Sequence, residues 1–245
     1  MKRILILLLL AAVLLGGCAG TPAETQPDTT APTQSTGTEA TEPLTEPAES
    51  EPENTFLYAG AEEYLLEPVE DFSWEREYAP EYVMIHANSA VVNHRNDPYN
   101  LEHIRDIFKD YEVSSHYIID RDGRIFCFVR EDRVAWHAGR GEFAGDEKLT
   151  DNMNRYSISI ELMGIGTREE MSIYLTEQEY AALDPGLPGF TDAQYEALSG
   201  LVSDLCRRYG IPADRSHIIG HGEYSSTKWD PGALFDWDRL MKAIG

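Results

Sequence analysis

Residues 82–90 read YVMIHANSA, a short apolar run that leads into His86. Such a run predicts a buried strand that ends at the histidine. A second stretch, residues 217–220 (HIIG), predicts another short strand, and His221 follows it directly. Each of these two predicted strands therefore brings a histidine to its end.

Periodicity and turn chemistry predict the neighbouring elements. Apolar residues at positions 101, 104, 107 and 108 have helical spacing. Residues 115–120 and 124–129 are rich in β-forming residues and flank Arg121-Asp122-Gly123, which predicts a hairpin with a positive φ at the glycine. Residues 157–162 (SISIEL) alternate and predict a further strand. We expect residues 163–188 to form a long surface excursion.

A pattern typical of a helix start lies near the beginning of the C-terminal part of the chain. Thr191-Asp192-Ala193-Gln194 has the form of a capping box, and apolar residues follow at positions 195, 198, 201, 202 and 205. This helix should stop near Gly210, before Pro212. Strands mixed with helices, including a hairpin, indicate an α/β fold: a single domain with a mixed central β-sheet flanked by helices.

We expect three segments along the chain. Residues 1–18 have the pattern of a signal peptide, because two basic residues precede an apolar run at 4–15 that is too short for a permanent membrane helix. Residues 19–55 consist almost wholly of Thr, Pro, Glu, Ala and Ser, which predicts a disordered acidic tether. Residues 56–245 have the composition of one globular domain.

The end of the signal carries a second feature. Leu15-Gly16-Gly17-Cys18 resembles the lipobox of bacterial lipoproteins, in which the cysteine is lipidated. This pattern predicts an exported protein, anchored through Cys18 on the outer side of the cytoplasmic membrane, in the cell envelope. The alternative is an ordinary secretion signal with an incidental cysteine.

Charge and cysteine content narrow the function classes. The net charge of −23 argues against nucleic-acid binding, which requires basic residues to neutralise phosphates. Cys127 and Cys206 lie in apolar patterns without metal-ligand spacing, so we expect two buried free thiols rather than a disulfide. The oligomeric state stays open.

His86, His221 and Asp230 form a candidate metal site. Two imidazoles and one carboxylate are a common donor set for catalytic zinc, with the fourth position left to water. No local spacing rule selects these three residues, and a histidine at a strand end is more often a hydrogen-bonded structural residue.

A family resemblance strengthens the zinc interpretation. Eight short words resemble the zinc-dependent N-acetylmuramoyl-L-alanine amidases of the type 2 amidase family, related to peptidoglycan recognition proteins, and they occur in the family's order. They cover about residues 80–240 and read VMIHANSA (83–90), SSHYIIDRDG (114–123), AWHAG (135–139), NRYSISIELMG (154–164), FTDAQYEAL (190–198), IIGHGEY (218–224), KWDPG (228–232) and FDW (235–237).

The resemblance implies a role for each matching residue. His86, His221 and Asp230 match the family's ligands for one Zn²⁺, Glu161 matches its catalytic glutamate, and Lys228 matches its catalytic lysine. Some relatives use a tyrosine where this chain has Ser115, so the chain resembles the glutamate-using version.

The resemblance says less about which residues contact the substrate than about the metal ligands. His137 in AWHAG is expected to touch substrate or orient Glu161, with a purely structural role as the alternative. Relatives usually have a bulkier residue and then Thr after the first histidine, where this chain has Ala87-Asn88, so Asn88 is a candidate substrate contact. Alternation places Glu161 on one face with Ser157 and Ser159, which could face solvent or line a wet cleft.

The implied activity is hydrolysis of the amide between the lactyl group of N-acetylmuramic acid and L-alanine of the stem peptide. Glu161 would serve as the base for a zinc-activated water, and Lys228 would stabilise the oxyanion. The expected partners are peptidoglycan or muropeptides. One alternative is a non-catalytic muropeptide-binding module, and another is a cytoplasmic recycling amidase that acts on soluble anhydro-muropeptides.

Overall fold

The computed structural model describes residues 56–245. The predictions for residues 1–55, namely the signal peptide, the lipobox at Cys18 and the tether, lie outside this part of the chain. The strands are β1 (Ala61–Glu63), β2 (Ser73–Glu75), β3 (Tyr82–Asn88), β4 (Tyr117–Ile119), β5 (Ile125–Cys127), β6 (Arg133–Ala135), β7 (Ser157–Met163) and β8 (Ile218–Gly220).

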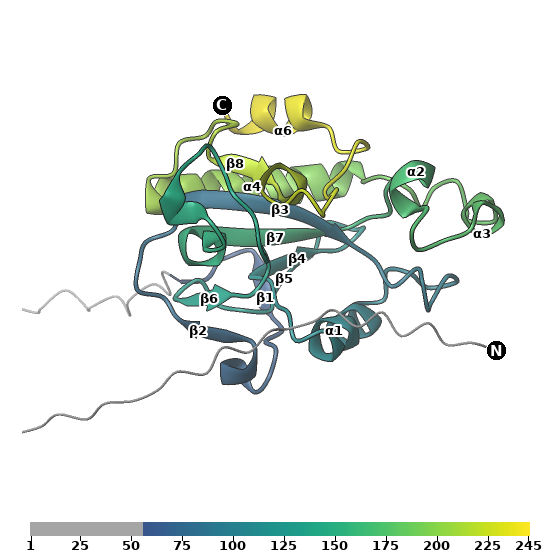
Figure 1. The fold of residues 1–245 in the computed structure, drawn as a ribbon, viewed down its shortest axis with the longest axis horizontal. Coiled ribbons are helices and arrows are strands. Elements are labelled where there is room, and N and C mark those ends of the chain that lie inside the picture. Colours follow the sequence, from purple (N-terminus) through teal and green to yellow (C-terminus); the bar gives the residue numbers. More distant parts are fainter. Residues whose placement is uncertain (1–55) are drawn as a thin grey trace, which may run out of the picture. The chain divides into compact units, whose positions relative to one another are not determined.

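Six of these strands form one mixed sheet with the order β1–β5–β4–β7–β3–β8 (Figure 1). The β4–β5 pair is the predicted antiparallel hairpin, and the other four pairs are parallel. Gly123 turns the hairpin with φ +82°, and a Cβ there would lie 2.7 Å from the carbonyl oxygen of Ala193. β2 and β6 form a separate antiparallel pair.

The helices are α1 (Leu101–Asp110), α2 (Arg168–Met171), α3 (Glu177–Ala181), α4 (Asp192–Tyr209), α5 (His221–Tyr224) and α6 (Trp237–Ile244), with short 3-10 turns at Val69–Asp71, Glu147–Leu149 and Met153–Tyr156. The predicted capping box is present: the Thr191 hydroxyl accepts from the backbone N–H of Gln194, whose side chain accepts from Thr191 N–H. α4 ends at Gly210 in the left-handed conformation. The predicted α/β fold, with helices flanking a mixed sheet, is confirmed.

Alternate residues of the central strands face opposite sides of the sheet. Val83 and Ile85 of β3 belong to the core under α4 and α6, and Figure 1 shows α4 passing behind β3. Met84 and His86 therefore lie on the other face, which α1 partly covers through Ile104 and Phe108. The histidine of the opening stretch is thus on the face that α4 leaves uncovered.

One detail of the central strands differs from prediction, and one open alternative is resolved. β3 continues through His86 to Asn88 instead of ending at the histidine. The polar face of β7 is not exposed to solvent: Ser157 and Ser159 are fully buried and Glu161 is 7% exposed. This agrees with the second alternative, a cleft, because Glu161 lines the cleft beside His86, while Ser157 and Ser159 are covered by their contacts with Met153 and His116.

The predicted excursion after β7 contains α2 and α3. Ile165 pairs with Pro188 and Gly189, which closes the excursion at its base. Figure 1 shows α2 and α3 beyond the ends of β3 and β7. Cys127 and Cys206 are free thiols, as expected, although Cys206 is only half-buried. Within residues 56–245, no helix combines the length and apolar character needed to cross a membrane.

Candidate metal centre and active site

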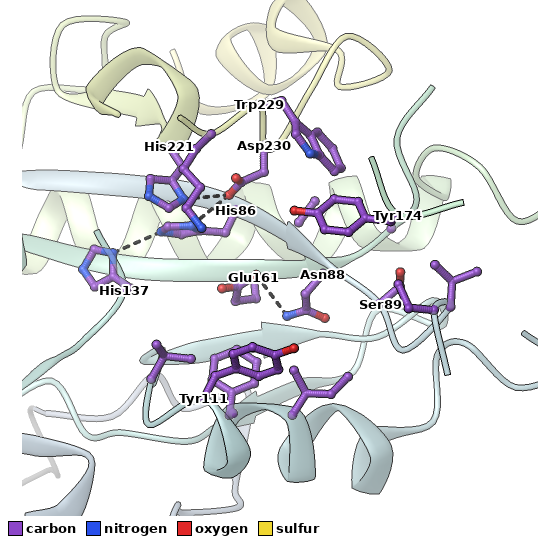
Figure 2. Close-up of a pocket in the computed structure, with 18 of the residues that line it drawn as sticks. His86, Asn88, Ser89, Tyr111, His137, Glu161, Tyr174, His221, Trp229 and Asp230 are labelled. Carbon is purple, nitrogen blue, oxygen red and sulfur yellow. Dashed lines mark hydrogen bonds and ion pairs between the residues drawn. The ribbon is translucent and has the colours of Figure 1, made fainter. Parts of the chain in front are cut away.

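The predicted site residues meet where three parallel strands end. His86 lies near the end of β3, its register partner on β7 is Glu161, and His221 follows β8 as the first residue of α5. Asp230, from the loop after α5, points toward both histidines (Figure 2). The fold therefore brings together residues up to 144 positions apart in sequence.

Three potential metal donors converge within hydrogen-bonding distance. Oδ2 of Asp230 lies 3.0 Å from Nδ1 of His86 and 3.1 Å from Nδ1 of His221. The three donor atoms all lie within 4.8 Å of one another, and both histidines are buried. Two imidazoles and a carboxylate fit the chemistry of catalytic zinc.

The electrostatics keep these donors in metal-binding form. Burial, together with the neighbouring His221, lowers the pKa of His86 to about 4, so its imidazole is neutral near pH 7. Burial alone would raise the pKa of Asp230, but hydrogen bonds from His221 and His86 overcome this and hold it well below its usual range. Asp230 is therefore a carboxylate at all physiological pH values.

The pKa of Glu161 is shifted in the direction opposite to that of Asp230. Burial, reinforced by the charge of Asp230, raises the pKa of Glu161 to about 8, although the hydrogen bond from Asn88 and the charge of Lys228 act against the rise. Nδ2 of Asn88 donates to Oε2 of Glu161 at 3.0 Å. The buried Oδ1 of Asn88 has no partner among residues 56–245. Asn88 therefore holds the glutamate in place, a contact that sequence reasoning missed because it depends on the β3–β7 register.

Lys228 lies on the exposed lip of the same cleft, two residues before Asp230. In the described part of the chain its ammonium group forms no ion pair, so its three N–H donors are available to a ligand. Its positive charge reaches Glu161 and His86. The predicted catalytic pair thus shares one cavity with the three donors.

His137 contacts the donors rather than Glu161. Its Nδ1 lies 3.1 Å from Nε2 of His86, and its Nε2 lies 3.1 Å from Oγ of Ser157. It also lines the cleft, so contact with a substrate stays a prediction. Ser115 is buried and bonds to Ser159, while His116 is fully buried between Ser159 and the carbonyl of Arg133.

The walls of the cleft, about 350 Å³ in volume, are aromatic and apolar. Tyr111, at the end of α1, and Tyr174, in the excursion after α2, lie on opposite sides of the opening (Figure 2). Trp136 and Trp229 also contribute to the walls. The sequence analysis did not single out these residues, because an exposed tyrosine at a helix end or in a loop carries no local signal of its role.

The fold and the donor set together define a class: within residues 56–245, an α/β domain with a His–His–Asp group that could hold a metal ion in a cleft, beside a buried glutamate. Residues 76–233 match the N-acetylmuramoyl-L-alanine amidase family (Amidase_2). The chain belongs to this family.

Curated relatives lie in the same family. The chain is 36% identical over 134 residues to 1,6-anhydro-N-acetylmuramyl-L-alanine amidase AmpD of Haemophilus influenzae, a match that covers 54% of this chain and 59% of AmpD. It is 32% identical over 141 residues to N-acetylmuramoyl-L-alanine amidase AmiD of Escherichia coli, covering 54% of this chain and 45% of AmiD. The matched region thus spans less than two thirds of these relatives.

Two solved structures have a similar fold. A selenomethionine derivative of AmpD superposes with a TM-score of 0.56 and 25% identity, covering 78% of this chain and 98% of that one. AmiD from E. coli, in complex with its substrate anhydro-N-acetylmuramic acid-L-Ala-D-γ-Glu-L-Lys, gives a TM-score of 0.51 and 26% identity, covering 67% and 57%.

Proposed function

We propose that this chain is a zinc-dependent N-acetylmuramoyl-L-alanine amidase. It hydrolyses the amide between the lactyl group of N-acetylmuramic acid and L-alanine in peptidoglycan or muropeptides. The observation that carries this proposal is the convergence of His86, His221 and Asp230 beside the buried Glu161 in one cleft. The names of AmpD and AmiD, and the muropeptide bound to AmiD, support the same bond and substrate class.

His86, His221 and Asp230 would hold the metal. When bound, zinc supplies a water of lowered pKa and polarises the amide carbonyl. The Nδ1 atoms of both histidines face Oδ2 of Asp230, while their Nε2 atoms contact His137 and the carbonyl of Ala138, so the Nδ1 atoms would be the metal donors. The aromatic walls of the cleft offer apolar surface for the substrate beside the scissile bond.

Glu161 is the proton carrier of the proposed reaction. Its Oε2 is held by Asn88, which leaves Oε1 of the ionised form of Glu161 to take the proton of the attacking water. A carboxyl group whose pKa is raised toward neutrality can then return that proton to the amine of L-alanine as the bond breaks. Lys228, at the lip of the cleft, donates to the oxyanion of the tetrahedral intermediate.

Mass spectrometry of products from a defined muropeptide tests the bond and the substrate together. We expect the zinc-loaded protein to release an intact stem peptide that begins with L-alanine, together with the free muramic acid carboxylate. Parallel assays with intact sacculi and with soluble anhydro-muropeptide separate the wall-acting and recycling alternatives. Tight muropeptide binding by the zinc-loaded protein, with no product, would instead identify a binding module.

We also propose that Cys18 anchors the protein in the cell envelope, with residues 19–55 as the tether and residues 56–245 as the catalytic domain. The support is the lipobox-like pattern at 15–18 and the Thr/Pro/Glu-rich composition that follows. Fractionation should find the wild-type protein in the membrane and the Cys18→Ala variant outside it. A wild-type protein found in the soluble fraction would contradict the anchor.

A further inference from the structure

The cleft has two walls of different chemistry. The first, here called the apolar wall, comes from α1 and the segments beside it and consists of Val92, Ile107, Phe108, Tyr111 and Val113. The second comes from the loop after α5 and contains the charged side chains of Lys228 and Asp230. Figure 2 shows Tyr111 and Asp230 on opposite sides of Glu161. A substrate whose amide lies beside Glu161 therefore has a different surface to meet on each side.

Tyr111 is unusually exposed for an aromatic side chain. Its exposed fraction of 74% is the highest of any aromatic residue within 56–245, and over that range its side chain forms no hydrogen bond and no ring contact. Val92 and Val113 on the same wall are 46% and 39% exposed. Single exposed apolar residues are ordinary, but a patch of them inside a cleft indicates a surface that a ligand covers.

The backbone after α1 holds this ring in place. Glu112 has φ +52°, in the left-handed region that a non-glycine residue seldom adopts. Its N–H donates to the carbonyl of Lys109, and the N–H of Val113 donates to that of Phe108, which is the pattern of a Schellman motif. The chain therefore reverses directly after Tyr111, and Val113 returns to the same wall.

The charges around the apolar wall favour an uncharged ligand. None of its five residues is charged, and Asp110 and Glu112, which flank Tyr111 in sequence, are exposed and acidic. A carboxylate placed here would lose part of its hydration and gain no cation in return. The two arms of the proposed substrate differ in this respect, because the sugar is uncharged once its lactyl group forms an amide, whereas a stem peptide ends in a carboxylate. The apolar wall therefore fits the sugar arm.

We propose that the apolar wall is the subsite for the muramic acid ring and that Tyr111 binds this ring by packing against one of its faces. The C–H groups on the face of a pyranose carry a partial positive charge, which the negative face of an aromatic ring attracts. The stem peptide then lies along the opposite wall, on the side of Lys228. The inference rests on the proposed function for the identity of the substrate, and it sets the direction in which the substrate crosses Glu161.

Steady-state kinetics of the zinc-loaded protein on a defined muropeptide test this subsite. Tyr111→Ala should raise KM about 10-fold and leave kcat within about twofold of wild type, because the ring contacts the substrate away from the reacting atoms. Tyr111→Trp keeps an aromatic face and should restore most of the affinity. Tyr78→Ala, which removes an exposed tyrosine outside the cleft, is the matched control and should behave like wild type. An unchanged KM in Tyr111→Ala would contradict the subsite.

Binding of the two products separates the sugar from the peptide. NMR titrations of the zinc-loaded protein with N-acetylmuramic acid and with a free stem peptide report each arm without turnover. Tyr111→Ala should weaken binding of the sugar about 10-fold and leave that of the peptide unchanged. Equal weakening of both, weakening of the peptide alone, or a wild type that does not bind the sugar would overturn the inference. A protein that binds both products and cleaves no muropeptide would refute the proposed function, while the titrations would still decide the subsite.

Discussion

Two carboxylates in one cleft are held in opposite protonation states by their surroundings. The side chain of Asp230 is 12% exposed and accepts hydrogen bonds from two histidines, which keep it ionised. Burial and the nearby negative charge of Asp230 favour the protonated form of Glu161, against the hydrogen bond that Asn88 donates to it. Because their surroundings push the pKa values of the two carboxyl groups apart, they support the proposed roles of Asp230 as a metal ligand and of Glu161 as a proton carrier.

The raised pKa of Glu161 has a consequence for the stability of the metal-free protein. The folded state keeps a proton that the unfolded state releases, so the free energy of unfolding falls as the pH rises from about 4.5 to about 8. Glu161→Gln removes this titration. In the presence of a chelator, the variant should therefore gain stability relative to wild type across that range, as measured by urea denaturation at several pH values.

The matched control for this measurement is Glu142→Gln, because Glu142 is exposed on the surface. Its stability difference from wild type should stay nearly constant with pH. A Glu161→Gln variant whose stability runs parallel to wild type from pH 5 to 8 would show that the carboxyl group is already ionised in the folded protein.

Lys228 should affect the rate and leave the metal site intact. Its ammonium makes no ion pair in residues 56–245 and is not one of the converging donors, so Lys228→Met should keep full zinc content. Loss of an oxyanion donor typically lowers kcat about 100- to 1000-fold. Steady-state kinetics on a defined muropeptide, with zinc measured in the same samples, checks this. Lys242→Met on α6 is the control, and a parallel loss of zinc and rate would reject the assigned role.

At the scale of elements, a buried ionic cluster around Glu131 connects the C-terminal end of α4 to the β4–β5 hairpin. Glu131 is fully buried in the loop between β5 and β6. It accepts hydrogen bonds from Tyr209 at 2.6 Å, from Arg208 at 2.7 Å and from the hydroxyl of Tyr117 on β4. The cluster therefore joins the hairpin to the helix that covers the face of the sheet opposite the cleft.

Glu131→Gln should destabilise the domain strongly, because it leaves the charge of Arg208 without one of its partners. Breaking a buried ion pair costs about 3–5 kcal/mol. Glu63→Gln, which removes an exposed partner of Arg130, should cost about 1 kcal/mol or less. Denaturant unfolding compares the two. Equal small effects would mean that water reaches the cluster.

Elements with local signals were the ones that sequence predicted well. The capping residues of α4, the glycine of the β4–β5 hairpin and the helical spacing of α1 each act within a few residues. The burial of the polar face of β7 could not be read in this way, because it depends on which segments pack against that face. The length of β3 beyond His86 is likewise set by pairing with β7.

The residues of the candidate site likewise could not be predicted from local sequence patterns. His86, His221 and Asp230 are too far apart in sequence for a spacing rule, and the family resemblance supplied them. The contacts of Asn88 with Glu161 and of His137 with His86 arise from strand register and loop path, which no local pattern encodes.

At the scale of the whole domain, the site depends on three neighbouring parallel strands. β7, β3 and β8 end at the same edge of the sheet and present Glu161, His86 and His221 there. Long connections follow each strand, and they supply Asp230, Lys228 and the aromatic walls. A framework of short buried strands thus positions the donors, while the loops form the surface that meets substrate.

Metal removal should therefore loosen the domain as well as inactivate it. The three donors belong to β3, α5 and the following loop, so an ion bound by all three adds a link between these segments. A ligand that binds only the folded state adds about 2.7 kcal/mol of stability at a free concentration 100 times its Kd. Thermal unfolding of residues 56–245 should show a lower Tm with a chelator and recovery with added zinc. Asp230→Asn, which lacks one donor, should show a much smaller response, and a wild-type Tm unaffected by either addition would contradict metal binding at this site.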